Sequence, residues 1–238
     1  MKEELFKLYT DIRLGQNEIC QSCISNEDFL TRPLSYYYAD KEFKNLNDTV
    51  IFVGKTAIGG EGFPLTNSLF SDATNFGELS LDLKEEYATR RAYYSYTNEI
   101  IKRYYGSYEI GKKFAALTNI TKCNNTSTKD ETSKNVKTHC IDKLGIIWKE
   151  IEILNPKRVI FYTGRDYDDF IEKYKPQNCI EVIEVVDNYN ECWWHRKFLD
   201  INKNTIFDLL RVYHPQRKTK EDYVSKIVNW LNQTKSNQ

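Results

Sequence analysis

The stretch 114–123, Phe-Ala-Ala-Leu-Thr-Asn-Ile-Thr-Lys-Cys, decides the fold, because an apolar run passes directly into polar groups. The run Phe114–Leu117 is typical of a buried strand. Open α/β sheets place their sites at the carboxyl ends of the strands, and this strand ends in Thr118 and Asn119. The amide of Asn119 offers a donor and an acceptor to a base edge, and Cys123 can bind a metal. Taken alone, the stretch is most simply interpreted as a strand that continues into a loop. Whether it belongs to a functional site therefore depends on the other segments of the sequence.

Composition places the chain among ordinary globular proteins. Its 238 residues suffice for one α/β domain, and 40% of them are hydrophobic and 29% charged. Aromatic residues reach 14%, with 17 tyrosines, so flat stacking surfaces are expected. The formal net charge is zero, so a nucleic-acid partner would have to meet a local basic patch. The sequence shows no signal peptide and no long apolar run, and we expect a cytoplasmic protein without a membrane partner.

Apolar runs that alternate with helical patterns predict the elements. Strands are expected at 49–54, 114–119, 159–164, 180–186 and 207–213, and helices at 1–18, 78–105, 138–153, 165–174 and 220–233. This alternation implies a parallel sheet covered by helices on both faces. The polar segments 24–48 and 124–137 are expected to be loops. The segment 187–204, which contains two adjacent tryptophans, is expected to be a hydrophobic plug rather than a stacking surface.

A glycine-rich loop follows the first strand, with glycines at 54, 59, 60 and 62. These glycines allow unusual backbone angles and the close approach of a ligand. Neither the dinucleotide-binding fingerprint nor the P-loop spacing is present, and a flexible turn is the alternative.

Six cysteines in a chain expected to be cytosolic favour metal binding or chemistry over disulfides. Cys20 and Cys23 form a C-x-x-C motif, in which a turn would let two thiolates face one metal or cluster. A redox pair and two buried cysteines are the alternatives.

Four features follow one another along the chain. They are an amphipathic helix before Cys20 and Cys23, a strand entering the glycine-rich loop at Gly54, a strand ending in Asn119 with Cys123 and Cys140 after it, and a strand ending in His214-Pro215. This ordered set resembles the iron–sulfur branch of the uracil-DNA glycosylase superfamily. The segment 155–164, Asn-Pro-Lys-Arg-Val-Ile-Phe-Tyr-Thr-Gly, is similar to that family as well. The resemblance covers nearly the whole chain.

The resemblance implies one uracil-DNA glycosylase-like domain over 1–238, with the N-terminal helix and first cluster ligands at 1–23. The expected fold is a three-layer α/β/α sandwich with a central, mostly parallel four-stranded sheet. The family would hold a [4Fe–4S] cluster on Cys20, Cys23, Cys123 and Cys140. Four thiolates suit such a cluster or zinc. Cys179 and Cys192 have no counterpart and are expected to be ordinary buried residues.

The activity that the resemblance implies is that of a monofunctional DNA glycosylase, which flips a base out of DNA and hydrolyses its N-glycosidic bond. Asn119 would read the Watson–Crick edge of the base, and His214 would donate to a base oxygen as negative charge develops there. The loop residues Gly54, Lys55, Thr56 and Ala57 would complete the pocket. Arg217, Lys218 and Lys220 would hold phosphates or enter the minor groove. We expect DNA as the partner and a monomer.

The first loop departs from the family pattern Gly-Glu-Ala-Pro-Gly, because this chain has Gly-Lys-Thr-Ala-Ile at 54–58. The loop lacks the acidic residue, and the aspartate that activates water in other branches is absent too. Backbone, Thr56 or Glu61 would have to orient the water. The stacking position falls on Leu65, with Phe63 two residues earlier, and either is a candidate to cover the base.

A changed loop implies a changed pocket, so the expected substrate is uracil or a modified pyrimidine. DNA repair is the expected role with uracil. Excision of a bulky modified cytosine from phage DNA, as antiviral defence, is the alternative. A non-catalytic nucleic-acid-binding module on the same fold and a zinc-stabilised α/β protein of another function also stay open.

Overall fold

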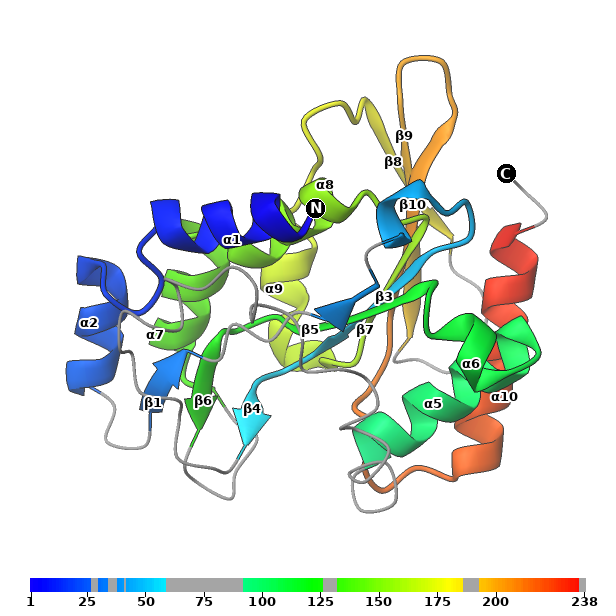
Figure 1. The fold of residues 1–238 in the computed structure, drawn as a ribbon, viewed down its shortest axis with the longest axis horizontal. Coiled ribbons are helices and arrows are strands. Elements are labelled where there is room, and N and C mark those ends of the chain that lie inside the picture. Colours follow the sequence, from blue (N-terminus) through cyan, green and yellow to red (C-terminus); the bar gives the residue numbers. More distant parts are fainter. Residues whose placement is uncertain are drawn as a thin grey trace.

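The fold is described from a computed structural model that covers residues 1–26, 30–33, 38–40, 42–58, 92–125, 132–185 and 193–235. The chain is an α/β protein built on a seven-stranded mixed sheet (Figure 1). The strand order is β2 (Tyr38–Ala39), β5 (Ala115–Asn119), β3 (Val50–Gly54), β7 (Arg158–Phe161), β10 (Thr205–Arg211), β9 (Trp194–Leu199) and β8 (Glu181–Val185).

The four neighbouring strands β5, β3, β7 and β10 run parallel, whereas β2, β9 and β8 pair antiparallel. The α/β prediction is confirmed, but the prediction of a four-stranded sheet is wrong. Three antiparallel strands extend the sheet at its two edges. β2 has only two residues, too few for a visible period of two.

Strand β9 corrects the expectation of a hydrophobic plug at 187–204. It pairs with β10 on one side and β8 on the other. His195 of β9 is buried, and its Nε2 lies 2.7 Å from Oδ1 of Asp208. A polar residue therefore occupies an inward-facing position, so the alternation of apolar and polar residues that is typical of a strand is not visible in the sequence. Residues 187–192 of the predicted plug lie outside the described part of the chain.

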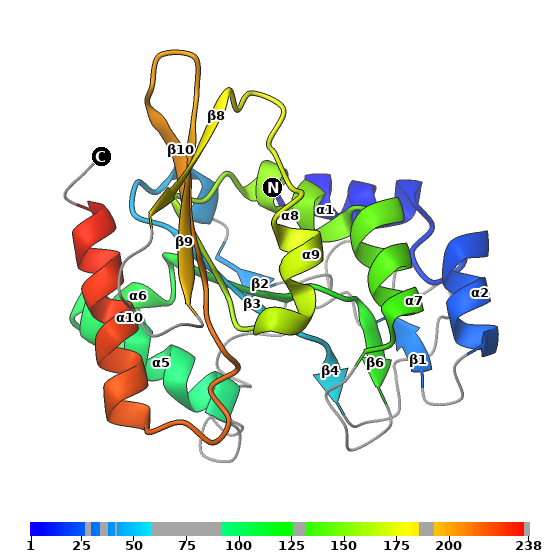
Figure 2. The ribbon, with the colours of Figure 1, turned by 180° about the vertical axis from the view of Figure 1, so that it is seen from behind.

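Two hydrophobic cores cover opposite faces of the sheet, because successive strand residues point to opposite sides. Ile51 and Val53 belong to one core, and Val50 and Phe52 belong to the other. The helices on the first face are α1 (Lys2–Asp11), α8 (Ile146–Leu154) and α9 (Asp168–Ile171), with the short 3₁₀ helices η1 (Phe43–Asn45) and η3 (Arg165–Tyr167). The helices on the second face are α5 (Ala92–Tyr105), α6 (Tyr108–Gly111) and α10 (Lys220–Lys235). Figures 1 and 2 show these two groups of helices on either side of the sheet.

Two further corrections concern helices. Cys20 and Cys23 lie within a second helix, α2 (Glu18–Asn26), and not in a turn after one N-terminal helix. The helix expected at 138–153 is two helices, because Gly145 has a φ of 60° between a π-helical turn η2 (Thr138–Lys143) and α8. The helix α7 (Lys134–Lys137) precedes η2 directly. None of the described helices is both long and apolar enough to cross a membrane.

A second, three-stranded sheet stands beside the carboxyl edge of the main sheet. Its order is β1 (Leu30–Pro33), β6 (Cys123–Asn125) and β4 (Ala57–Ile58). β1 and β6, together with β2 and α7, replace parts of the loops expected at 24–48 and 124–137, and β4 lies in the expected glycine-rich loop. The sheet matters for the site because β4 follows β3 and β6 follows β5. It therefore joins the chain segments that leave two neighbouring parallel strands.

Candidate functional site

Four cysteines that are distant in the sequence line one small cavity. Cys20 and Cys23 come from α2, Cys123 from β6 and Cys140 from η2. Each of the four side chains is buried. The structure thus brings together the four residues that the resemblance singles out as ligands.

The arrangement of these thiols bears on which group fits them. Within the described residues, no three His, Cys, Asp or Glu side chains are placed to hold one metal ion. A zinc ion would need all four sulfurs at about 2.3 Å from a single point. An iron–sulfur cluster carries its thiolates around a larger body, so its ligands line a cavity instead of meeting at a point. The buried all-cysteine set around this cavity is a donor set that both groups use.

Polar groups next to this cavity were not expected from the sequence. Sγ of Cys23 lies 3.0 Å from Nδ1 of His139, and the backbone N–H of Lys122 donates to Sγ of Cys140 over 3.4 Å. Burial raises the pKa of Cys140 to about 12, and burial followed by repulsion from the other thiols raises the pKa of Cys123. The thiols of Cys123 and Cys140 therefore keep their protons near neutral pH in the absence of a metal.

At the carboxyl edge of the main sheet, Asn119 lies directly beside Gly54. The two residues are register partners on β5 and β3, and the N–H of Ile120 donates to the carbonyl of Gly54 over 2.8 Å. A Cβ atom on Gly54 would overlap Oδ1 of Asn119, and it would lie 3.3 Å from the ring of Tyr93. Only glycine therefore lets the Asn119 amide lie across this strand end. The Tyr93 hydroxyl also donates to the Phe52 carbonyl over 3.2 Å, a role that the sequence pattern did not reveal.

The loop after β3 is bound to the segment that carries Cys123. The Thr56 hydroxyl donates to the carbonyl of Cys123 over 2.6 Å, and both the N–H and the hydroxyl of Thr121 donate to the carbonyl of Lys55 over 3.1 Å. Ala57 is the register partner of Asn124 in the small sheet. The hydroxyl proton of Thr56 is thus engaged, so this oxygen meets a further ligand as an acceptor.

The His214 loop follows β10 at the same edge. Nδ1 of His214 accepts the N–H of Gln216 over 3.3 Å, so the neutral ring carries its proton on Nε2. The hydroxyl of Tyr96 donates to the carbonyl of Lys218 over 2.7 Å, and Nζ of Lys220 donates to Ser95 over 2.8 Å. Helix α5 therefore anchors the loop on which the basic residues lie.

A buried ion pair connects the Asn119 edge with the cysteine cavity. Nζ of Lys122 lies 2.6 Å from Oε2 of Glu150, and the two side chains are 1% and 0% exposed. The same ammonium donates to Oγ1 of Thr118 over 2.6 Å and to the carbonyl of Asn119 over 2.7 Å. Glu150 also accepts from the hydroxyls of Tyr9 and Thr118. Every proton of the ammonium thus has an acceptor. Its hydrogen bonds to Thr118 and Asn119 hold the carboxyl end of β5 in position.

Four of the residues considered in the sequence lie outside the described part of the chain, namely Glu61, Phe63, Leu65 and Cys192.

A scan against protein-family models and a search of curated proteins found no match. The function is therefore argued from the residues of this chain and their arrangement.

Proposed function

We propose that this protein is a DNA glycosylase that hydrolyses the N-glycosidic bond of an extruded pyrimidine and leaves an abasic site. The observation that carries the proposal is the combination of two features along one strand exit. The Asn119 amide lies across Gly54, and four residues later Cys123 joins three other buried cysteines around a cavity. The resemblance noted in the sequence rests on the same residues, in the same order.

The span of the edge supports a pyrimidine between Asn119 and His214. β5 and β10 are separated by β3 and β7, which puts the two strand ends roughly 14 Å apart at about 4.8 Å per strand. The side chains of Asn119 and His214, with one pyrimidine base between them, would fill this distance. In this proposal the Asn119 amide pairs with the Watson–Crick edge of the base.

His214 would act on the leaving base. As the C1′–N bond breaks, its electron pair moves to the base and negative charge develops on an exocyclic carbonyl oxygen of the base. A neutral imidazole with its proton on Nε2 can donate to that oxygen, and losing such a donor costs roughly 10²–10³ in rate. Water adds to C1′ and loses a proton to solvent, while the base anion takes up a proton on release.

The four cysteines would hold an iron–sulfur cluster whose contribution is structural. Bound there, the group would cross-link α2, β6 and η2, which contribute Cys20, Cys23, Cys123 and Cys140. The segment 119–123 would then be fixed at Cys123, in addition to the hydrogen bond from the Lys122 ammonium to the carbonyl of Asn119.

A base-excision assay tests the proposal. Anaerobically purified protein is incubated with labelled oligonucleotides that carry uracil and with phage DNA that carries modified cytosines, and alkali then breaks the abasic sites. We expect cleavage at one of these bases and a 10²–10³-fold slower rate for His214→Ala. Lys175→Ala, an exposed change far along the chain from the site residues, serves as the control and should cleave at the wild-type rate. Equal rates for His214→Ala and the wild type would overturn the assignment of this residue.

A second candidate, a module that binds a nucleic acid or a modified base without cleaving it, is favoured by the first loop. Residues 54–58 contain no carboxylate, and the hydroxyl proton of Thr56 is engaged by the Cys123 carbonyl. Tight binding of the same DNA without any cleavage would favour this candidate over the glycosylase.

A further inference from the structure

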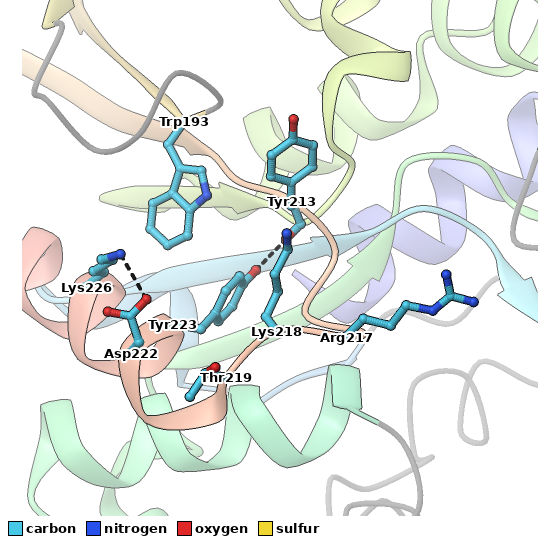
Figure 3. Close-up of a pocket in the computed structure, with 8 residues that line it drawn as sticks. All are labelled: Trp193, Tyr213, Arg217, Lys218, Thr219, Asp222, Tyr223 and Lys226. Carbon is cyan, nitrogen blue, oxygen red and sulfur yellow. Dashed lines mark hydrogen bonds and ion pairs between the residues drawn. The ribbon is translucent and has the colours of Figure 1, made fainter.

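A cavity of about 290 Å³ lies next to the His214 loop and contains neither Asn119 nor any cysteine. Its walls are the loop after β10, the first turns of α10 and Trp193 just before β9 (Figure 3). This volume is at the lower end for small-molecule sites, so it accommodates one small ligand.

Aromatic rings form the walls of this cavity. The rings of Trp193 and Tyr223 meet edge to face, with centroids 5.4 Å apart and planes at 77°. Tyr223 is buried, and its hydroxyl donates to the carbonyl of Tyr213 over 2.5 Å. The Tyr213 ring lies on the other side of the opening in Figure 3. A flat ligand can therefore contact rings that other contacts already hold in position, which lowers the entropy cost of binding.

Positive charge is concentrated at the same place, although the whole chain is neutral. Nζ of Lys218 lies 4.8 Å from the centroid of the Tyr213 ring, and Lys226 pairs with Asp222 at 2.9 Å. Within the part of the chain that the structure describes, no carboxylate forms an ion pair with Lys218. The side chain of Arg217 lines the cavity at its base and extends outward from it in Figure 3. Lys218 is thus the cation best placed to meet an anion at the aromatic walls.

The backbone of this loop is held before any ligand arrives. The N–H of Lys218 donates to the carbonyl of Pro215 over 3.1 Å, and the carbonyl of Lys218 accepts from Tyr96. Arg217 has a φ of 64°, a left-handed conformation that side chains rarely adopt. Strained residues of this kind persist where surrounding contacts impose them, and they are common at ligand sites.

We propose that this cavity is a nucleotide-binding subsite, separate from the site of base excision. A nucleobase stacks on Trp193 or Tyr213, and its phosphate meets Lys218, with the Thr219 hydroxyl as a further donor. Flat rings beside a cation that no carboxylate of the described residues pairs with suit this combination, because every base has a π-face and every nucleotide an anion. The ligand is a free nucleotide or one nucleotide of a single strand, since both present the same chemistry.

Direct binding measurements test this subsite without any cleavage. The probes are thymidine monophosphate, thymidine, inorganic phosphate and a short oligothymidylate, titrated into the wild type and variants by calorimetry or fluorescence anisotropy. Thymidine monophosphate or the oligonucleotide should bind more tightly than either thymidine or phosphate. Similar affinity for both nucleotide probes would indicate a free-nucleotide site, and binding of the oligonucleotide alone would indicate a strand-binding site.

Trp193→Ala should weaken nucleotide binding roughly five- to hundredfold, the range expected for one stacked base. Trp193→Phe, which keeps a ring, should retain most of the affinity even if the alanine variant is unstable. Lys218→Ala should weaken binding and lower the salt slope by roughly one. Lys175→Ala, again the control, should change nothing.

Two results would overturn the subsite. One is unchanged oligonucleotide and nucleotide affinity in both Trp193→Ala and Lys218→Ala. The other is phosphate binding as tightly as thymidine monophosphate, which would leave the rings without a role. A protein that excises no base and still shows the expected pattern would refute the proposed function and retain the subsite.

Discussion

Replacing Lys122 with methionine removes the cation from a fully buried ion pair. The ammonium lies 2.6 Å from Oε2 of Glu150, and neither side chain is more than 1% exposed. Breaking a buried pair by removing one partner costs about 3–5 kcal/mol, because a charge stays behind without compensation. The Glu150 carboxylate keeps the hydroxyls of Tyr9 and Thr118 as donors, so we expect a loss near the lower limit, about 3 kcal/mol.

The assay is equilibrium unfolding in urea, followed by circular dichroism at equal metal loading, because bound metal shifts the free energy of unfolding. Lys149→Met makes the same substitution at an exposed position on the same helix as Glu150, and it should change stability by less than about 0.5 kcal/mol. The double variant Lys122→Met/Glu150→Gln has no buried charge here. Its amide oxygen can accept from one of the two hydroxyls, and its NH2 group can donate to the oxygen of the other. It should therefore recover at least half of the loss.

Two outcomes would refute this reasoning. In one, Lys122→Met stays within about 1 kcal/mol of the wild type, which would mean that the pair is not buried as described. In the other, the double variant is no more stable than the single one. The loss would then come from packing around the lysine stem and not from an isolated carboxylate.

Three further predictions concern the strand end and the cysteine cavity. Gly54→Ala should displace the Asn119 amide and lower the excision rate or DNA affinity at least tenfold with little change in melting temperature, and an unchanged rate would contradict the overlap of Cβ with Oδ1. Cys140→Ser should lose bound iron, whereas Cys179→Ser, also buried but outside the cavity, should retain it, as measured by metal analysis and visible absorbance. Burial raises the pKa of Cys140 to about 12, so metal uptake must displace protons from the thiols. The apparent affinity for the metal, measured by competition with a chelator, should therefore rise from pH 6 to pH 9. An affinity that does not depend on pH would exclude thiolate ligation.

Much of the sheet could be predicted because its central strands are apolar on both faces. Strands β3 and β5 lie within one residue of their expected bounds, since helices cover the sheet on both sides and the runs 50–53 and 114–117 are apolar throughout. Strand β9 was missed for the opposite reason. Its inward residue His195 is polar and satisfied by Asp208, which no local pattern records.

In the candidate site, too, some residues could be recognised from the sequence and others could not. Cysteines, the terminal asparagine of a strand and a His-Pro loop are recognisable as residue types, so their chemistry could be proposed before any contact was known. Tyr93, His139 and Glu150 were not singled out, although each contacts a candidate site residue or a direct neighbour of one. In the sequence these three are ordinary members of helical patterns.

The sequence by itself determined which segments are buried strands and which residues carry donor and ligand chemistry, because hydrophobic periodicity and side-chain type are local properties. Only the tertiary structure decided that Gly54 makes room for Asn119, that Lys122 meets Glu150, and that four separated cysteines line one cavity. These contacts depend on strand order and register, which arise when segments far apart in the chain bury their apolar faces together.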